Sequence, residues 1–153
     1  LINAGTYILE PDIFKLMPEG AHSIERDVYE DLAEIGGLNG FPFEGWFVDA
    51  GTSASYIEAA QVCIANERFS SGTVEGDSWF GEGSDIEGEV SGSAIGAGTG
   101  IGEEASVHNS VVLDGAIIGE GAKVDRCLVG QGSSIAEGAI LADTIVGHGE
   151  RFE

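Results

Sequence analysis

The sequence predicts a short mixed α/β segment followed by an all-β solenoid, a parallel β-helix built from hexapeptide-type repeats. Two observations support this division. Apolar residues beyond residue 73 recur with a 17-residue period, and 18 of the 25 glycines lie in residues 71–153. All three prolines and most of the helix-like spacings lie in residues 1–70. We therefore expect two parts, residues 1–70 and residues 71–153, with a boundary between Ser70 and Ser71.

The repeat consists of three columns of apolar residues, each with one member per period. Steps of 5, 6 and 6 residues fit neither the period of a helix nor that of a strand. Repeats on this scale indicate a solenoid in which each short strand turns one apolar residue inward, onto its equivalent in the next coil. The columns are Val90, Val107, Val124 and Leu141; Ile95, Val112, Val129 and Val146; and Ile101, Ile118, Ile135 and Phe152.

Glycines and other small residues accompany these columns at regular places. We expect the glycines that follow inward positions to supply the backbone shapes of the corners. These glycines are Gly96, Gly102, Gly119, Gly130 and Gly147. Small residues suit the crowded bend before the next side, and they are Thr99, Ala105, Ala116, Ala122, Ser133 and Ala139.

The two ends of the repeat differ from its middle. Val74, Phe80 and Ile86 keep a six-residue step but Val90 follows after four, which predicts a distorted entry coil. The free edge of the last coil is a surface on which another subunit could pair, so a homo-oligomer through the β-helix is expected.

The first part predicts the end of a larger α/β sheet domain. Strands are expected at residues 6–9, 38–43 and 46–48, and a short helix at residues 11–17, between Pro11 and Pro18. A second helix would begin after Ser23, present Ile24, Val28, Leu32 and Ile35 on one face, and end at Gly36-Gly37. Thr52 or Ser53 would cap a third helix, whose buried side would be Tyr56, Ala60, Cys63 and Ile64. No complete βαβαβ unit is present.

Composition excludes some functions. The formal net charge of −21, from 27 acidic and 6 basic residues, argues against nucleic-acid binding, which needs clustered Lys and Arg. Acidity spread over both parts predicts a protein from a high-salt habitat. No stretch is long and apolar enough for a membrane span, so no membrane partner and a cytoplasmic location are expected. Cys63 and Cys127 have no metal-ligand or redox spacing and are expected as buried, reduced thiols.

Three strings, followed by the hexapeptide repeat, carry a resemblance to a known family. They are INAGTYIL at residues 2–9, SIERDVY at residues 23–29 and GWFVDAGT at residues 45–52. Their order resembles the C-terminal part of the sugar-1-phosphate nucleotidyltransferases, and SIERD is most similar to the mannose-1-phosphate guanylyltransferase branch. The resemblance implies the end of a Rossmann-like nucleotidyltransferase sheet domain followed by a left-handed β-helix.

The resemblance also implies a reaction, in which a nucleoside triphosphate, with GTP favoured, and a sugar 1-phosphate give a nucleotide sugar and pyrophosphate. Asp49 would be the catalytic metal ligand for Mg²⁺, which neutralises phosphate charge. Asn3 and Gly5 would lie beside the sugar, Glu25 would accept from its hydroxyls, and Arg26 would lie near its phosphate. The plain structural alternatives are a helix cap for Asp49, a turn or strand-end residue for Asn3, and a first-turn acid and a solvated base for Glu25 and Arg26.

Some family features are absent from this chain. The Gly-x-Gly-Thr-Arg loop that cradles the nucleotide phosphates, the first metal-binding Asp and the Glu-Lys-Pro string are not found in it. We therefore expect a C-terminal part of such an enzyme that is inactive alone. A non-catalytic regulatory or assembly subunit of the same family remains an alternative. So does a hexapeptide-repeat acyltransferase with His108 or His148 as general base.

Overall fold

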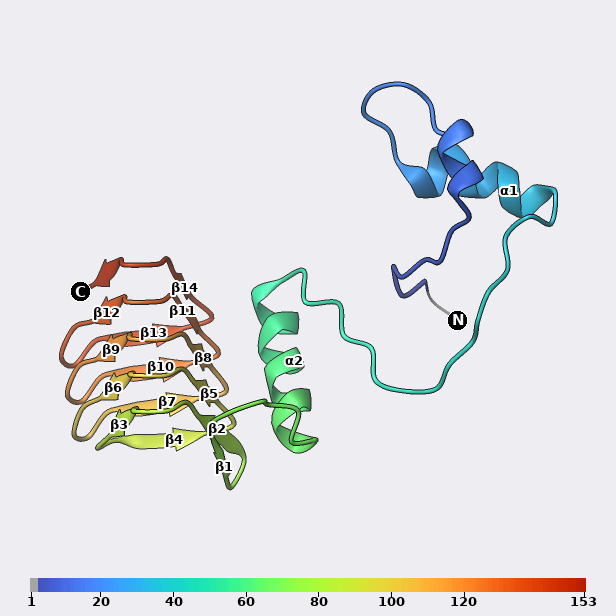
Figure 1. Ribbon diagram of the computed structural model, residues 1–153. Coiled ribbons are helices and arrows are strands. Elements are labelled where there is room, and N and C mark those ends of the chain that lie inside the picture. Colours follow the sequence, from blue (N-terminus) through green and yellow to red (C-terminus); the bar gives the residue numbers. More distant parts are fainter. Residues whose placement is uncertain (1–2) are drawn as a thin grey trace. The chain divides into compact units, whose positions relative to one another are not determined.

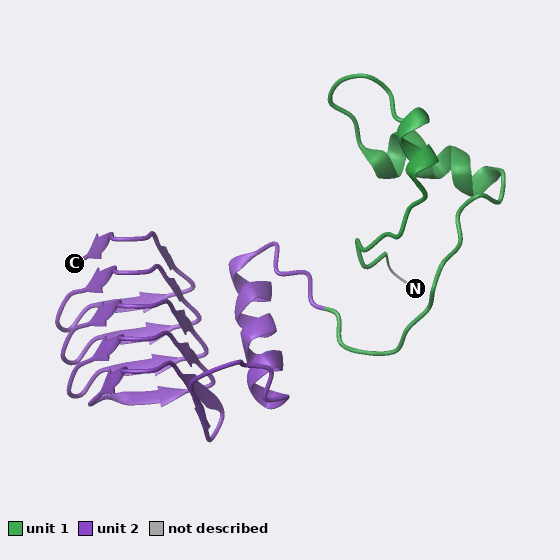
Figure 2. Ribbon diagram, in the orientation of Figure 1, with its two compact units in different colours: residues 1–47 green, residues 48–153 purple. Residues whose placement is uncertain are grey.

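The computed structural model describes residues 3–153, and the chain divides into two compact units, residues 1–47 and residues 48–153 (Figure 2). The second unit begins at Val48, well before the boundary expected from composition, because the helix that precedes the β-helix packs against it. The start of the first family-like string, Ile2, lies outside the described residues. No helix in residues 3–153 is long and apolar enough to cross a membrane.

The second unit contains the predicted parallel β-helix, whose short strands stack into three sheets (Figure 1). Sheet 1 contains β1 (Thr73–Glu75), β2 (Ser78–Phe80), β5 (Ala94–Ile95), β8 (Val111–Val112), β11 (Leu128–Val129) and β14 (Ile145–Val146). Sheet 2 contains β3 (Asp85–Ile86), β6 (Gly100–Ile101), β9 (Ile117–Ile118), β12 (Ser134–Ile135) and β15 (Arg151–Phe152). Sheet 3 contains β4 (Glu89–Ser91), β7 (Ser106–His108), β10 (Lys123–Asp125) and β13 (Ile140–Ala142).

The three predicted columns form the core of the β-helix. Register pairs Ile95 with Val112, Ile101 with Ile118, and Val107 with Val124, as the predicted period requires. Ile95, Val107 and Val129 are fully buried. Burying one such side chain stabilises the fold by roughly 1.5–3 kcal/mol, so the columns are the main source of stability in this unit. The predicted small residues are also buried, with Ala139 only partly so.

The entry to the β-helix differs from the prediction. Val74 lies in β1, which pairs antiparallel with β2 and places Val74 opposite Trp79. Val74 is therefore outside the coils, and its six-residue step to Phe80 is accidental, because the chain reverses in a hairpin at that point. The first coil is distorted as expected, since Phe80 pairs with Ile95 and the chain between them is shorter than one full period.

Glycines serve two different purposes in the coils. The glycines that follow inward residues do not have left-handed backbone shapes, so that expectation is wrong. Four of them, all but Gly147, face the backbone of the next coil too closely for a side chain: a Cβ on Gly96 would lie 2.5 Å from the backbone nitrogen of Asp114. The left-handed corners instead use other glycines. Gly98, Gly115 and Gly132 have φ of 63°, 67° and 63°.

Glu104 occupies a left-handed corner position that glycine fills in the later coils. Its φ is 56°, and its equivalents in the next two coils are Gly121 and Gly138, with φ of 65° and 68°. A residue with a side chain destabilises the fold by about 1–2 kcal/mol in this conformation. Replacing it by glycine recovers only part of that energy, because glycine loses more conformational entropy on folding. Glu104→Gly is therefore expected to raise the free energy of unfolding by about 1 kcal/mol, measured in urea.

Glu103→Gly is the matched control for that change. Glu103 precedes Glu104, and its φ is not left-handed, so glycine there adds only flexibility and should destabilise by about 0.5–1 kcal/mol. Equal effects of the two substitutions would contradict the role of the corner.

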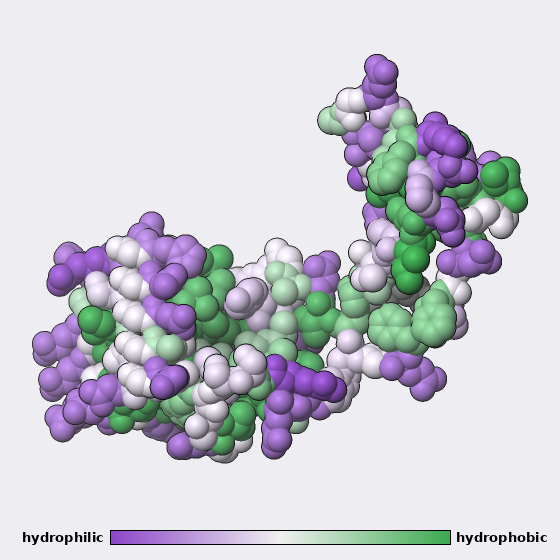
Figure 3. Space-filling model, in the orientation of Figure 1, coloured by the Kyte–Doolittle hydropathy of each residue, from purple (hydrophilic) through white to green (hydrophobic). Residues whose placement is uncertain are grey.

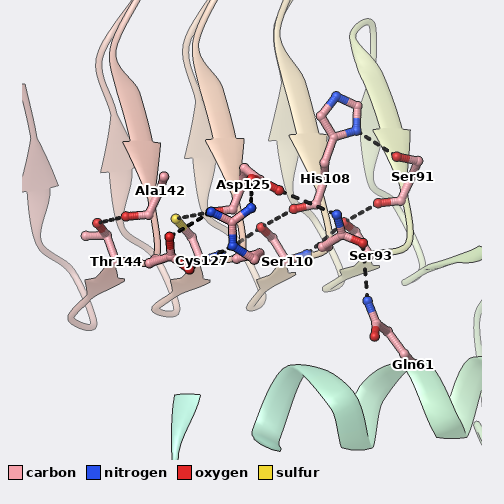
Figure 4. A network of polar contacts seen from close by, with 12 residues as sticks. Gln61, Ser91, Ser93, His108, Ser110, Asp125, Cys127, Ala142 and Thr144 are labelled. Carbon is pink, nitrogen blue, oxygen red and sulfur yellow. Dashed lines mark hydrogen bonds and ion pairs between the residues drawn. The ribbon is translucent and has the colours of Figure 1, made fainter. Parts of the chain in front are cut away.

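A ladder of small polar side chains connects successive coils at the corner between sheets 3 and 1 (Figure 4). Ser110 Oγ donates to the carbonyl of His108 at 2.7 Å and accepts from the backbone N–H of Cys127 at 2.9 Å. Ser93 and Ser110 are likewise connected, at 3.0 Å. Cys127 takes the hydroxyl position in its coil, donating to the carbonyl of Asp125 at 3.2 Å. Burial raises the pKa of this thiol, in keeping with an unreactive cysteine.

Helix α2 (Ser53–Ala65) begins as predicted at Thr52, whose side chain and that of Ser55 form a reciprocal capping box. The buried face agrees with the prediction at Ala60 and Ile64 and differs at Ile57, which is buried in place of Tyr56. Ile57 and Ile64 are buried against Ala94 and Val111 on the outer face of sheet 1, whereas Tyr56 is 41% exposed. Figure 3 shows hydrophilic side chains over the edge of the β-helix that lies away from α2.

The first unit is a small helical cluster without strands in its described residues. It contains a 3-10 helix η1 (Pro11–Lys15), a π-helical turn η2 (Glu25–Tyr29) and α1 (Glu30–Glu34). Its core comprises Ile13, Val28 and Tyr29, with Ile24 and Leu32 packed against it, whereas Ile35, expected on the same face, is exposed. The chain leaves α1 through Gly36, which has a left-handed φ of 70°, as the predicted helix end required.

The strands predicted at residues 6–9, 38–43 and 46–48 are not formed. A strand needs a partner for its backbone N–H and C=O groups, and no other strand is described in residues 3–72. Large apolar side chains of these segments are exposed, including Ile8, Phe41 and Trp46. The apolar pattern is present, but a pattern without a neighbouring strand does not form a sheet.

Candidate functional site

Three of the site residues implied by the resemblance come together in the first unit, joined by Tyr7. Asn3 Nδ2 donates to Tyr7 Oη at 2.6 Å and to Glu25 Oε1 at 3.1 Å, and Tyr7 Oη donates to the same Oε1. Asn3 Oδ1 accepts from the backbone N–H of Gly5 at 2.9 Å. Gly5 adopts a left-handed φ of 67° that closes this turn. Asn3, Gly5, Tyr7 and Glu25 therefore form one polar cluster, called here the Asn3 cluster.

Tyr7 was not among the predicted site residues, although a signal was present. It stands four residues after Asn3 in the same string, and its phenol can both donate to a carboxylate and accept from an amide. The hydrogen bond to the Glu25 carboxylate raises the pKa of Tyr7, because ionisation would remove the donated proton and place two negative charges side by side. Tyr7 thus stays a donor at neutral pH.

Packing and helix capping hold the cluster in place. The ring of Tyr7 meets the ring of Tyr29 edge-on, with centroids 4.8 Å apart, and Tyr29 is buried in the core of this unit. Glu25 stands in the first turn of η2, where Ser23 N donates to the Asp27 carboxylate at 2.7 Å and Arg26 N donates to Ser23 Oγ at 3.4 Å. The side chains of the cluster are therefore attached to a small but packed scaffold.

Two predicted residues lie outside the Asn3 cluster. Arg26 follows Glu25, and its side chain is exposed. Asp49 belongs to the second unit, where it is exposed three residues before the helix cap. The alternative that Asp49 caps α2 is wrong, because Thr52 is the cap. Its carboxylate is thus not committed to the helix.

Asp49 fits a shared Mg²⁺ site better than a complete one. Within residues 3–153, no group of three or more His, Cys, Asp or Glu side chains is placed to hold a metal ion. Mg²⁺ is often bound by one or two carboxylates together with substrate phosphates and waters, so a single exposed carboxylate fits as one ligand. Within the described residues Asp49 would therefore be a single ligand of such a site.

The histidines of the acyltransferase alternative make ordinary structural contacts. His108 lies on the outer face of sheet 3, where its Nδ1 is 2.6 Å from Ser91 Oγ (Figure 4). His148 Nδ1 accepts from the backbone N–H of Gln131 at 3.0 Å in the last coil. His108 is thus part of strand β7, whereas His148 lies in the turn between β14 and β15.

Two surface hollows of the second unit do not suit phosphate groups. One of about 540 Å³ is lined by α2 and the β1–β2 hairpin and includes Gln61, Glu67, Asp77 and Asn109. The other, of about 420 Å³, lies beside the first coil and includes Glu75 and Glu82. Neither is lined by Lys or Arg, and an acidic rim repels anionic ligands.

One cationic side chain forms a clamp between coils. Arg126 lies at a left-handed corner, with φ of 51°, and its Nε and Nη2 donate to the carboxylate of Asp143 in the next coil at 2.8 and 2.7 Å. Asp125 pairs with the same guanidinium. The hydrogen bonds from Arg126 lower the pKa of Asp143.

This clamp predicts an acid-dependent loss of stability. A lowered folded-state pKa adds stability above the ordinary Asp value of about 4, and that stability is lost as the pH falls through the folded-state pKa. The melting temperature of wild type should therefore exceed that of Asp143→Asn at neutral pH, and the gap should close below about pH 4. Thermal unfolding followed by circular dichroism at low salt measures both melting temperatures. A difference between them that does not change with pH would contradict the clamp.

The fold defines the second unit as a hexapeptide-repeat β-helix protein. A family described as "GlmU-like, C-terminal hexapeptide" matches residues 59–152, and the chain belongs to this family. The matched residues include most of α2 as well as the coils.

Curated relatives carry one name. The chain is similar to mannose-1-phosphate guanyltransferases of Kluyveromyces lactis and Saccharomyces cerevisiae, each 36% identical over 56 residues, which is 37% of this chain and 16% of the relative. A third, from Yarrowia lipolytica, is 31% identical over 65 residues, or 42% of this chain and 18% of the relative. The matches thus span less than one fifth of each relative.

Proposed function

We propose that this chain is the C-terminal part of a sugar-1-phosphate nucleotidyltransferase, with GTP and mannose 1-phosphate as substrates and GDP-mannose and pyrophosphate as products. The observation that carries the proposal is the Asn3 cluster, in which an amide and a carboxylate from two of the family-like strings are held side by side. The names of the curated relatives support the same reaction.

The residues of this chain would take the following parts. Asn3 and Glu25 accept hydrogen bonds from sugar hydroxyls, Gly5 leaves room for the ring, and Arg26 attracts the sugar phosphate. Asp49 would hold Mg²⁺, which would supply positive charge to neutralise the phosphates. The β-helix forms the contact between identical subunits, and Ile140 and Ile145, 72% and 62% exposed in the last coil, are the side chains that such a contact would cover.

The test compares this chain with the full-length product of the gene that encodes it, called here the uninterrupted polypeptide. We expect the longer polypeptide to release pyrophosphate from GTP and mannose 1-phosphate in the presence of Mg²⁺, and this chain alone to release none. GTP should be preferred over UTP and dTTP. A longer polypeptide that binds a homologous enzyme but releases no pyrophosphate would instead support the regulatory or assembly alternative.

A further inference from the structure

Tyr7 contacts both proposed sugar-binding side chains of the Asn3 cluster, which also contact each other. Its hydroxyl is an acceptor for Asn3 Nδ2 and a donor to Glu25 Oε1, so one oxygen links the two proposed sugar-binding groups. The two groups are 22 residues apart in the chain. Since an exposed amide and an exposed carboxylate each have several rotamers, this link restricts both.

Hydrogen-bond accounting shows what the cluster leaves for a ligand. An Asn amide has two N–H donors, and both are used, toward Tyr7 and toward Glu25. One lone pair of Asn3 Oδ1 is used by the N–H of Gly5. Glu25 Oε1 accepts from two donors already. The groups that remain on the side chains of Asn3 and Glu25 are a lone pair on Oδ1 and the whole of Oε2, and both are acceptors.

The ring of Tyr7 is held in place by packing against the core of the first unit. Its ring packs edge-on against Tyr29, which is 5% exposed, with Val28 in the same core. The hydroxyl therefore projects from an anchored ring toward the exposed amide and carboxylate. Within the described residues the hydroxyl of Tyr29 is buried without a hydrogen-bond partner, so it takes no part in the link.

We propose that Tyr7 is a positioning residue: it takes one donor of Asn3 while Glu25 takes the other, and it holds the Asn3 and Glu25 side chains together as a purely accepting pair. The ligand that matches this pair is a sugar that offers two hydroxyl donors, and a sugar with an acceptor at either place is rejected. This inference rests on the proposed function for the identity of the ligand, and its test separates the two.

The experiment is Tyr7→Phe in the uninterrupted polypeptide, which keeps the ring and removes only the hydroxyl. We expect the KM for mannose 1-phosphate to rise about tenfold, the size of one lost hydrogen bond to a charged group, with the KM for GTP and kcat changed less than about twofold. Deoxyfluoro analogues of mannose 1-phosphate replace an O–H donor by a weak acceptor. Wild type should discriminate against at least one of them, and Tyr7→Phe should lose most of that discrimination.

Tyr29→Phe is the matched control, because it removes the other tyrosine hydroxyl of the same core. It should leave the KM for mannose 1-phosphate unchanged. An unchanged KM in Tyr7→Phe, or equal rises in the KM values for GTP and mannose 1-phosphate, would overturn the positioning role.

Calorimetry separates this inference from the proposed reaction. If the longer polypeptide binds mannose 1-phosphate without turnover, and Tyr7→Phe weakens binding about tenfold, the reaction is wrong and the role of Tyr7 stands. If neither polypeptide binds the sugar phosphate, both are wrong.

Discussion

Gly119→Ala is expected to lower the free energy of unfolding by about 3 kcal/mol or more, measured by urea unfolding of this chain. A Cβ at this position would lie 2.6 Å from the backbone nitrogen of Glu137 and 2.8 Å from the carbonyl carbon of Ala136 in the next coil. Both contacts are with backbone, which no rotamer change relieves. Moving the coils apart would weaken the hydrogen bond from Gly119 N to the carbonyl of Ile135, now 2.9 Å.

Two other glycines provide graded controls for this prediction. Gly115 has open space around its Cβ position but a left-handed φ of 67°, so Gly115→Ala should cost only about 1–2 kcal/mol. Gly100 has open space and no left-handed φ, so Gly100→Ala should be neutral or slightly stabilising. Equal losses at Gly119 and Gly115 would show that backbone shape, and not coil spacing, selects glycine after the inward residues.

Asp49→Asn is expected to reduce kcat of the uninterrupted polypeptide at least about 100-fold, which corresponds to about 2.7 kcal/mol of transition-state stabilisation. The amide keeps the size of the side chain but removes the charge that attracts Mg²⁺. The Mg²⁺ concentration needed for half-maximal rate should also rise, and pyrophosphate release at several Mg²⁺ concentrations measures both effects.

Glu58→Gln is the matched control, since Glu58 is an exposed acid on α2. It removes the same charge from the same unit and should leave the rate and the Mg²⁺ requirement unchanged. Because Thr52 caps α2, a loss of activity in Asp49→Asn would not reflect an unwound helix. A rate within about twofold of wild type would remove Asp49 from the metal site.

The coils were predictable because a solenoid repeats one local rule. Each inward residue needs only its equivalent one coil away, so Ile101, Ile118 and Ile135 identify their own partners. The same rule was wrong for Val74, which has the correct spacing but lies in a hairpin outside the coils. The packing of α2 also had a signal that was not used: Ala94 and Val111, which point outward, are apolar and therefore need a cover.

The first unit was less predictable because its apolar residues lack partners within the described chain. The aromatic residues Phe41 and Phe43 favour a strand at residues 38–43, yet strand pairing depends on a neighbour that a single segment does not contain. The π-helical turn at Glu25–Tyr29, which buries Val28 and Tyr29, had no signal in the local sequence. Helix ends with short-range signals, such as the Thr52 cap, were predicted correctly.

The repeat period alone establishes the number of columns, their inward residues and the parallel stacking, because those features depend on spacing along the chain. Residues Asn3, Gly5 and Glu25 came from a family resemblance, and nothing in their spacing indicates a contact. Their association through Tyr7 follows from the packing of Tyr7 on Tyr29, which brings segments 22 residues apart into hydrogen-bond distance. The donor and acceptor pattern that the cluster offers a ligand is a property of that three-dimensional contact, because it depends on which hydrogens the neighbouring side chains already use.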